Sequence, residues 1–187
     1  MQNAECRRQD LFAVPTQRSV STTAHCHCHL KNGVIMKIEQ RLEELTIVLP
    51  PPSSPGGTYA RTVRVGDLLY VSGTGPIAGV RGHQGKLGQS FTVEEGYEAA
   101  RSVGIRVLAT LKEALGDLDR MSQLVKTLGM VNATPDFADH AKVVNGYSDL
   151  FVEVFGEIAG KGVRSAVGMS SLPGKISVEI ESLFLIG

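Results

Sequence analysis

The chain of 187 residues has no tryptophan, no net charge and no cysteine beyond residue 28. Its 19 basic side chains balance its 19 acidic ones. This balance argues against a dedicated DNA- or RNA-binding protein, because such proteins gain affinity from clustered lysine and arginine. No apolar run approaches the roughly 20 residues of a membrane-spanning helix. The composition therefore predicts a soluble globular protein, of which one domain of about 150 residues can fold without a metal or disulfides.

The three cysteines all lie within residues 1–35, whereas a secreted disulfide framework would distribute them through the fold. This placement predicts a reducing, intracellular setting. Residues 1–35 are also basic, rich in serine and threonine, and without apolar periodicity, as in organellar transit peptides. A disordered extension has the same features. We therefore expect an extension over 1–35 and a folded domain over 36–187, located in the cytoplasm, or in mitochondria if the extension is a transit peptide.

Residues 25–29 alternate histidine and cysteine, which are metal-ligating side chains. A zinc site needs four ligands that converge tetrahedrally, usually as two pairs separated by a loop. Strict alternation sends the histidines and the cysteines to opposite sides of an extended chain. The segment has no second ligand cluster nearby, so we expect no specific metal site, and no other cofactor is indicated.

The remaining chain alternates strand and helix patterns in the order expected of one compact domain. Apolar spacing and turn residues predict helices over 36–45, 92–115 and from 136 onward, and strands over 61–65, 68–71, 124–131, 163–172 and 176–186. We expect one mixed sheet with the two long helices on one face. The other face then needs a cover, which favours oligomerisation through the sheet.

The last two predicted strands carry the most informative polar residues. Side chains alternate between the faces of a sheet, so Arg164 lies on the same face of its strand as the small residues Ala166 and Gly168. A two-residue turn would bring Glu179 opposite Gly168, on the face that holds Arg164. An arginine fork matches a carboxylate, and a glutamate can activate a water. The same pair could instead be a structural ion pair.

Five stretches, in order, carry a resemblance to a known family. They are residues 57–59, 69–76, 136–147, 163–167 and 172–181. From about residue 55 onward the chain resembles the Rid family, also called YjgF-type or L-PSP proteins, and in particular a longer RidA-like branch. The resemblance implies a homotrimer of chorismate-mutase-like α+β subunits with three clefts between them. It also implies hydrolysis of reactive 2-imino or enamine acids to 2-keto acids and ammonia.

By this resemblance, Arg164 corresponds to the arginine that binds the substrate carboxylate and Glu179 to the glutamate that positions water. Further substrate-binding positions are Tyr59, Ser72, Asn145 and Ala166. Residues of these types also have ordinary structural roles: Tyr59 as a core aromatic, Asn145 as a helix-backbone partner, and Ser72 as the end of a strand.

The chain departs from the family pattern at two positions. Ala166 stands where many deaminating members have Cys or Thr, and Thr74-Gly75 replaces the usual residues before Pro76. These departures leave the substrate and the activity open.

Two other functions fit part of the pattern. One is a trimer that binds small carboxylates without turnover, and the other is an endoribonuclease of the L-PSP type. A second carboxylate at Glu179 favours catalysis, because it would repel the ligand of a pure carboxylate binder. The neutral charge and the lack of a His/Lys pair with nuclease spacing argue against the ribonuclease, since His83 and His140 are both interpreted as surface residues.

Overall fold

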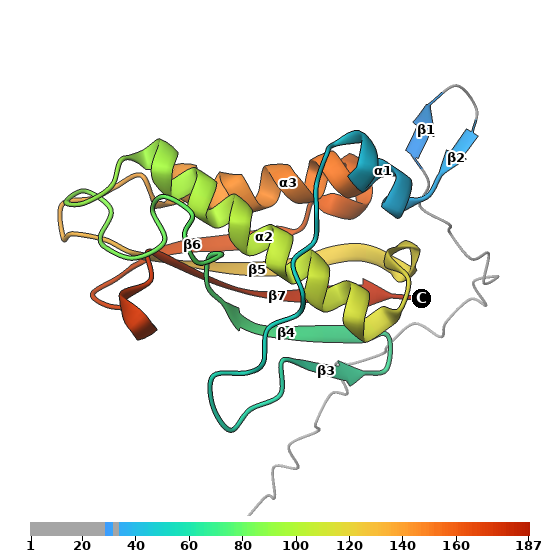
Figure 1. Ribbon diagram of the computed structural model, residues 1–187, viewed down its shortest axis with the longest axis horizontal. Coiled ribbons are helices and arrows are strands. Elements are labelled where there is room, and N and C mark those ends of the chain that lie inside the picture. The colour runs from blue at the N-terminus through green and yellow to red at the C-terminus, as the bar shows by residue number, and fades with distance from the viewer. Residues whose placement is uncertain (1–28, 32–33) are drawn as a thin grey trace, which may run out of the picture.

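The computed structural model describes residues 29–31 and 34–187 (Figure 1). Its main sheet has five strands in the order β3-β4-β7-β5-β6, in which β5 and β6 are parallel and the other neighbours antiparallel. The predicted mixed α+β architecture is confirmed. The elements are β1 (His29–Lys31), β2 (Val34–Met36), α1 (Ile38–Glu44), β3 (Thr62–Val65), β4 (Leu68–Thr74), α2 (Val93–Leu115), η1 (Leu118–Arg120), β5 (Met121–Asn132), α3 (His140–Gly160), β6 (Val163–Met169), η2 (Pro173–Lys175) and β7 (Val178–Ile186).

Helices α2 and α3 lie side by side on one face of the sheet (Figure 1). Their apolar residues meet alternate residues of the central strand, and Leu108, Phe151 and Phe184 are fully buried between the two layers. The helices cross closely at Gly146, where any Cβ atom would overlap the backbone carbonyl of Tyr97. Only glycine permits this approach. The apolar periodicity of the sequence thus specified which side of each helix forms the core.

The start of α2 is set by a local signal. The Thr92 side chain accepts a hydrogen bond from the Glu95 N–H, and the Glu95 carboxylate accepts one from the Thr92 N–H at 2.9 Å. This capping box satisfies two backbone donors that the first helical turn leaves free. The helix ends at Gly116, whose φ of +77° suits a residue without a side chain. The predicted beginning and end are confirmed.

Replacing Thr92 with alanine removes one of these hydrogen bonds. We expect Thr92→Ala to lower the free energy of unfolding by about 1 kcal/mol, the usual cost of losing an N-cap. Denaturant unfolding monitored by circular dichroism measures this change. Ser90→Ala, at an exposed position just before the helix, is the matched control, and an equal effect of both variants would contradict the capping role.

The opposite face of the sheet carries exposed apolar side chains. Val63, Val65, Tyr70, Val167 and Leu185 are each between 37% and 59% exposed, and in the strand register they lie on the side away from the helices. The described part of the chain therefore covers one face of the sheet and leaves the other open, as the sequence predicts. Exposed apolar surface of this extent is typical of an interaction face.

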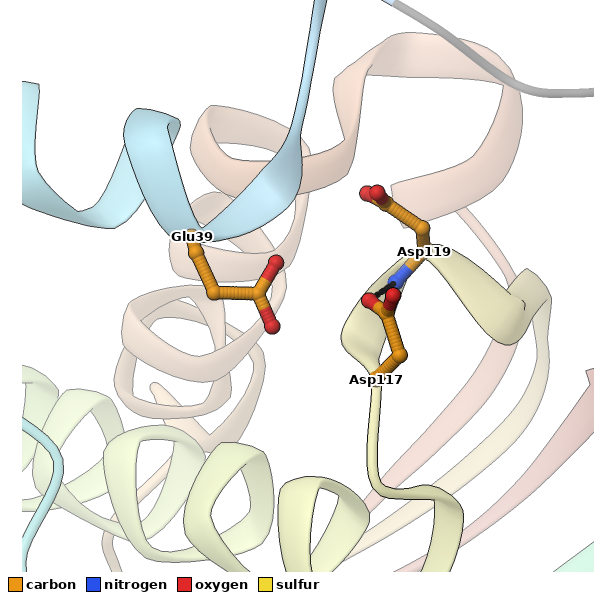
Figure 2. A group of neighbouring side chains, drawn as sticks. All are labelled: Glu39, Asp117 and Asp119. Carbon is orange, nitrogen blue, oxygen red and sulfur yellow. Dashed lines mark hydrogen bonds between the residues drawn. The ribbon is translucent and has the colours of Figure 1, made fainter.

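Helix α1 is fastened to the body by two carboxylates, Glu39 and Asp119, and Asp117 lies beside them. Asp119 accepts a hydrogen bond from the Ile38 N–H at 2.8 Å, Glu39 pairs with the Lys112 ammonium, and Asp117 accepts from the Asp119 N–H at 3.0 Å. Figure 2 shows Glu39 directed toward Asp117, which precedes η1, and Asp119, which lies in it. The hydrogen bond that Lys112 donates to the Glu39 carboxylate raises the pKa of Lys112. Asp119 and Glu39 therefore attach α1 to η1 and α2, whereas Asp117 only stabilises the η1 turn.

Two sequence-based expectations about element boundaries are wrong. Helix α3 begins at His140, four residues after the expected Asp136. Before it, the Phe137 N–H donates to the Thr134 carbonyl in a separate turn. The N-cap position is occupied by Asp139, whose side chain makes no capping hydrogen bond. The first aspartate after the strand, Asp136, was therefore the wrong starting signal.

The predicted hairpin between the last two strands is also wrong. Strand β5 lies between β6 and β7, so β6 and β7 do not pair with each other. Their connection contains η2, with Gly174 at φ +59°. Glu179 consequently lies opposite Met130 of β5, and Gly168 opposite Val131. A Pro-Gly turn signal marks a change of direction but does not specify which strand becomes the neighbour.

The N-terminal part of the chain is described only in two short strands. β1 and β2 pair with each other in a sheet of their own, at the end of the segment that we expected to lack regular structure. The rest of that segment, with most of the histidine–cysteine alternation, lies outside the described residues. Among the helices of the described chain, none has the length and apolar character needed to cross a membrane.

Candidate functional site

Arg164 lies on the edge strand β6 and faces helix α3. Its Nη1 donates to the Ser148 hydroxyl at 2.9 Å, and its Nη2 donates to the Ala141 carbonyl at 3.3 Å. Both partners are neutral, and within the described residues no carboxylate lies in salt-bridge range of this guanidinium. The contacts orient the side chain and leave its charge available to an anion.

A cleft of about 560 Å³ opens beside this arginine, between α3 and the β5–β6 edge of the sheet. Asn145 and Ser148, one helical turn apart, line it together with Arg164 and Thr127. Thr127 is 1% exposed, and its hydroxyl has no hydrogen-bond partner in the structure. Beside Arg164 the cleft offers an amide and hydroxyl groups, a suitable lining for a small carboxylate. Its three acidic residues, Asp149, Glu153 and Glu157, are each paired with another side chain, namely Tyr97, Arg101 and Lys161.

Glu179 lies at the start of β7, on the sheet face that the helices leave open. Its carboxylate rests directly against the backbone of Gly73 in β4, where a Cβ atom would overlap it. Burial, and next the nearby charge of Glu181, raise the pKa of Glu179. A carboxylate in such a position is a stronger base than one in water, which suits proton transfer near neutral pH.

Glu179 shares a second cleft, of about 290 Å³, with Tyr59 and Ser72. Tyr59 is 50% exposed, so its interpretation as a core aromatic is wrong. Its hydroxyl accepts a hydrogen bond from the Gly56 N–H at 3.1 Å. His83 is half-buried and lines the same cleft, which corrects its interpretation as a surface residue.

The predicted site residues thus fall into two groups. Tyr59, Ser72 and Glu179 share one cleft, and Asn145 and Arg164 share the other. Ala166 lines neither of them and packs against the hydrophobic core.

The expectation that Arg164 and Glu179 share a face is wrong. The guanidinium faces α3, whereas β7 turns Val178 and Ile180 toward the helices and Glu179 away from them. One subunit therefore holds the two groups on opposite sides of its sheet.

Sequence reasoning missed several polar residues of both clefts. Ser148 follows Asn145 by three positions, so helical periodicity alone could have placed it on the same side. Thr127 and the arginines of the second cleft, Arg61 and Arg106, gave no comparable signal. They reach the clefts only because distant segments pack together.

Comparisons with known proteins agree on one family. The profile described as "YjgF/chorismate_mutase-like, putative endoribonuclease" matches residues 39–178. Protein TCP17 of Trypanosoma cruzi is 41% identical over 148 residues, which are 79% of this chain and 92% of that protein.

Solved structures point the same way. A protein from Shewanella oneidensis, described as a putative endoribonuclease, is 32% identical with a TM-score of 0.76 and covers 81% of this chain and all of its own. RidA from an Antarctic Psychrobacter is 26% identical with a TM-score of 0.50, covering 73% of this chain and 94% of its own.

Proposed function

Because the chain belongs to the YjgF/chorismate mutase-like family, we propose that it hydrolyses 2-imino acids to 2-keto acids and ammonia. The reaction takes place in clefts between the subunits of a homotrimer. The observation that carries this proposal is the separation of Arg164 and Glu179 on opposite faces of one sheet. A small substrate can touch both groups only where two chains meet.

A second copy of the chain also accounts for the open face of the sheet. This face carries a groove of about 570 Å³ that is bordered by the apolar Val63, Tyr70, Leu128 and Leu183 and by the polar Lys126, Ser165 and Glu181. Burying such surface against another subunit is favourable by roughly 25 cal/mol per Å². Cyclic symmetry repeats the same contact around the ring, so each subunit would supply one arginine cleft and one glutamate cleft.

The two clefts divide the chemistry between them. The guanidinium of Arg164, fixed by Ser148, binds the substrate carboxylate through two parallel hydrogen bonds. Glu179 of the neighbouring subunit takes a proton from a water molecule whose oxygen adds to the imine carbon. The glutamate then passes that proton to the nitrogen, which gives a carbinolamine. It next takes the hydroxyl proton of this intermediate and delivers it to the nitrogen as the carbon–nitrogen bond breaks, so ammonia leaves and the hydroxyl-bearing carbon becomes the keto group. Glu179 ends in its starting state.

Mixing two inactive variants tests the shared cleft. Arg164→Ala has an intact Glu179, and Glu179→Gln has an intact Arg164. After co-expression and random assembly, about a quarter of the clefts should combine both intact groups. We expect imine hydrolysis to return to about that fraction of the wild-type rate, followed as keto-acid release from a coupled amino-acid oxidase.

Two controls make the result decisive. The double variant Arg164→Ala/Glu179→Gln, mixed with either single variant, should restore no activity. If the two single variants each lack activity and mixing restores none although mass spectrometry of the intact trimers shows mixed assemblies, the two groups do not share a cleft between chains. A wild-type protein that binds keto acids but hydrolyses no imine would be a carboxylate-binding trimer instead.

A further inference from the structure

The cleft of Glu179 contains two arginines that the proposed reaction does not use. Arg61 immediately precedes β3, and Arg106 lies in the middle of α2. The segment between α1 and β3 crosses α2 (Figure 1) and carries Ser53 between them. The Ser53 hydroxyl accepts hydrogen bonds from both guanidinium groups, at 2.6 Å from Arg106.

Both arginines have only neutral partners. Arg106 donates to the carbonyls of Gly75 and Pro76 at 2.8 and 3.1 Å, and Arg61 donates to the Thr110 hydroxyl. In contrast, Arg41, Arg64, Arg81 and Arg101 each pair with a carboxylate. In the part of the chain that the structure describes, no carboxylate lies in salt-bridge range of Arg61 or Arg106.

This arrangement is costly for the protein alone. The Nε of Arg61 is buried and has no hydrogen-bond acceptor, and a buried donor without a partner destabilises the fold. Burial, followed by the charge of Arg61, lowers the pKa of Arg106. Two neighbouring cations share the Ser53 hydroxyl and otherwise contact only backbone carbonyls and the Thr110 hydroxyl. An anion would stabilise such a site.

We propose that Arg61 and Arg106 form a second anion-binding position in the Glu179 cleft, which selects 2-imino and 2-keto acids with a second carboxylate on the side chain. The choice of imine as substrate rests on the proposed function, but the binding of the second carboxylate does not. The α-carboxylate would be held by Arg164 of a neighbouring subunit and the distal one by this pair. The reacting carbon then lies between them, beside Glu179.

Two keto acids of equal chain length test this position. 2-Oxoglutarate carries the distal carboxylate and 2-oxopentanoate lacks it, so their affinities for the full-length protein, measured by calorimetry, isolate its contribution. We expect 2-oxoglutarate to bind roughly 10-fold to 100-fold more tightly, as for a charge-assisted hydrogen bond. The preference should disappear in Arg106→Gln and weaken in Arg61→Gln. Arg120→Gln, an exposed site at the end of η1, should keep it.

The ratio of the two affinities separates ligand binding from a purely structural role. If the arginines only fasten the segment that crosses α2 at Ser53, their loss weakens the binding of both keto acids equally, and the ratio of the two affinities does not change. Equal affinities in the wild-type protein overturn the proposal without any variant. Should Arg106→Gln fail to fold, the ratio of affinities in the wild-type protein and in Arg61→Gln still tests the proposal.

The outcome is independent of the reaction itself. Hydrolysis of imines from neutral amino acids without any preference for acidic ones would leave the proposed function standing and reject the second anion position. An Arg106-dependent preference for 2-oxoglutarate without imine hydrolysis would support the anion position and reject the deaminase.

Discussion

Glu179→Gln is expected to lower the turnover of imine hydrolysis by a factor of roughly 100 or more, the usual contribution of a positioned acid–base group. Glutamine keeps the shape of the side chain against Gly73 but cannot take a proton from water. Binding of keto acids should survive or strengthen, because the anionic ligand no longer meets a second carboxylate. Keto-acid release in a coupled oxidase assay, together with calorimetric binding, measures both effects.

The pH dependence gives this prediction a second readout. Burial and Glu181 raise the pKa of Glu179, so the carboxylate form is less favourable in the folded protein than in the unfolded chain. Turnover should therefore fall as the pH drops through this raised pKa. The remaining turnover of Glu179→Gln should not show this fall at low pH. The effect on the free energy of unfolding is opposite to the effect on turnover: the ionised carboxylate that turnover needs destabilises the folded protein. Above the ordinary pKa of glutamate, ionisation opposes folding, and so the variant should be at least as stable as the wild type at neutral pH.

A structural ion pair would give a different pattern. Glu179→Gln would then lose thermal stability or trimer affinity in parallel with activity. Unchanged turnover in a stable variant would exclude Glu179 from the reaction. Glu181→Gln, on the same strand and face but exposed, is the matched control and should retain most of the activity.

Arg164→Lys is expected to raise the Michaelis constant for a 2-imino acid by roughly 10-fold to 100-fold, although it preserves the charge. A lysine ammonium is a point charge and cannot form two parallel hydrogen bonds to a carboxylate. Its single nitrogen also cannot occupy the two positions from which Nη1 and Nη2 of Arg164 reach Ser148 and Ala141, so the contacts that orient the guanidinium are lost. Steady-state kinetics with an oxidase-generated imine measures the change.

The same exchange elsewhere provides the control. Arg120→Lys alters an exposed arginine outside both clefts and should leave the Michaelis constant unchanged. If Arg164→Lys also leaves it unchanged while the protein stays folded, the guanidinium does not bind the substrate carboxylate. Ser148→Ala should raise the Michaelis constant by less than Arg164→Lys does, because it removes only one of the contacts that fix the arginine.

Local signals in the sequence were sufficient for most of the secondary structure. The capping box at Thr92 and the glycine at 116 specify the ends of α2, because both act within one helical turn. The turn at residues 66–67 specifies the β3–β4 hairpin in the same way. Apolar periodicity also predicted a sheet with one covered and one open face, because it indicates which side chains are buried.

The grouping of the site residues depended on the tertiary structure. Alternation along a strand relates neighbours such as Arg164 and Ala166, but the relation between Arg164 and Glu179 depends on the connection between their strands. Shifting a strand by one residue moves every side chain to the other face. Here β5 enters between β6 and β7, and η2 replaces a two-residue turn.

The sequence by itself thus determined most of the elements, the covered face of the sheet and the residue types that the chemistry needs. Only the tertiary structure decided that Arg164 and Glu179 lie on opposite faces, and that Arg61 and Arg106 meet at Ser53. The physical reason is the range of the interactions. Caps and turns act between residues a few positions apart, whereas strand order and the path of the segment across α2 depend on burial across the whole domain.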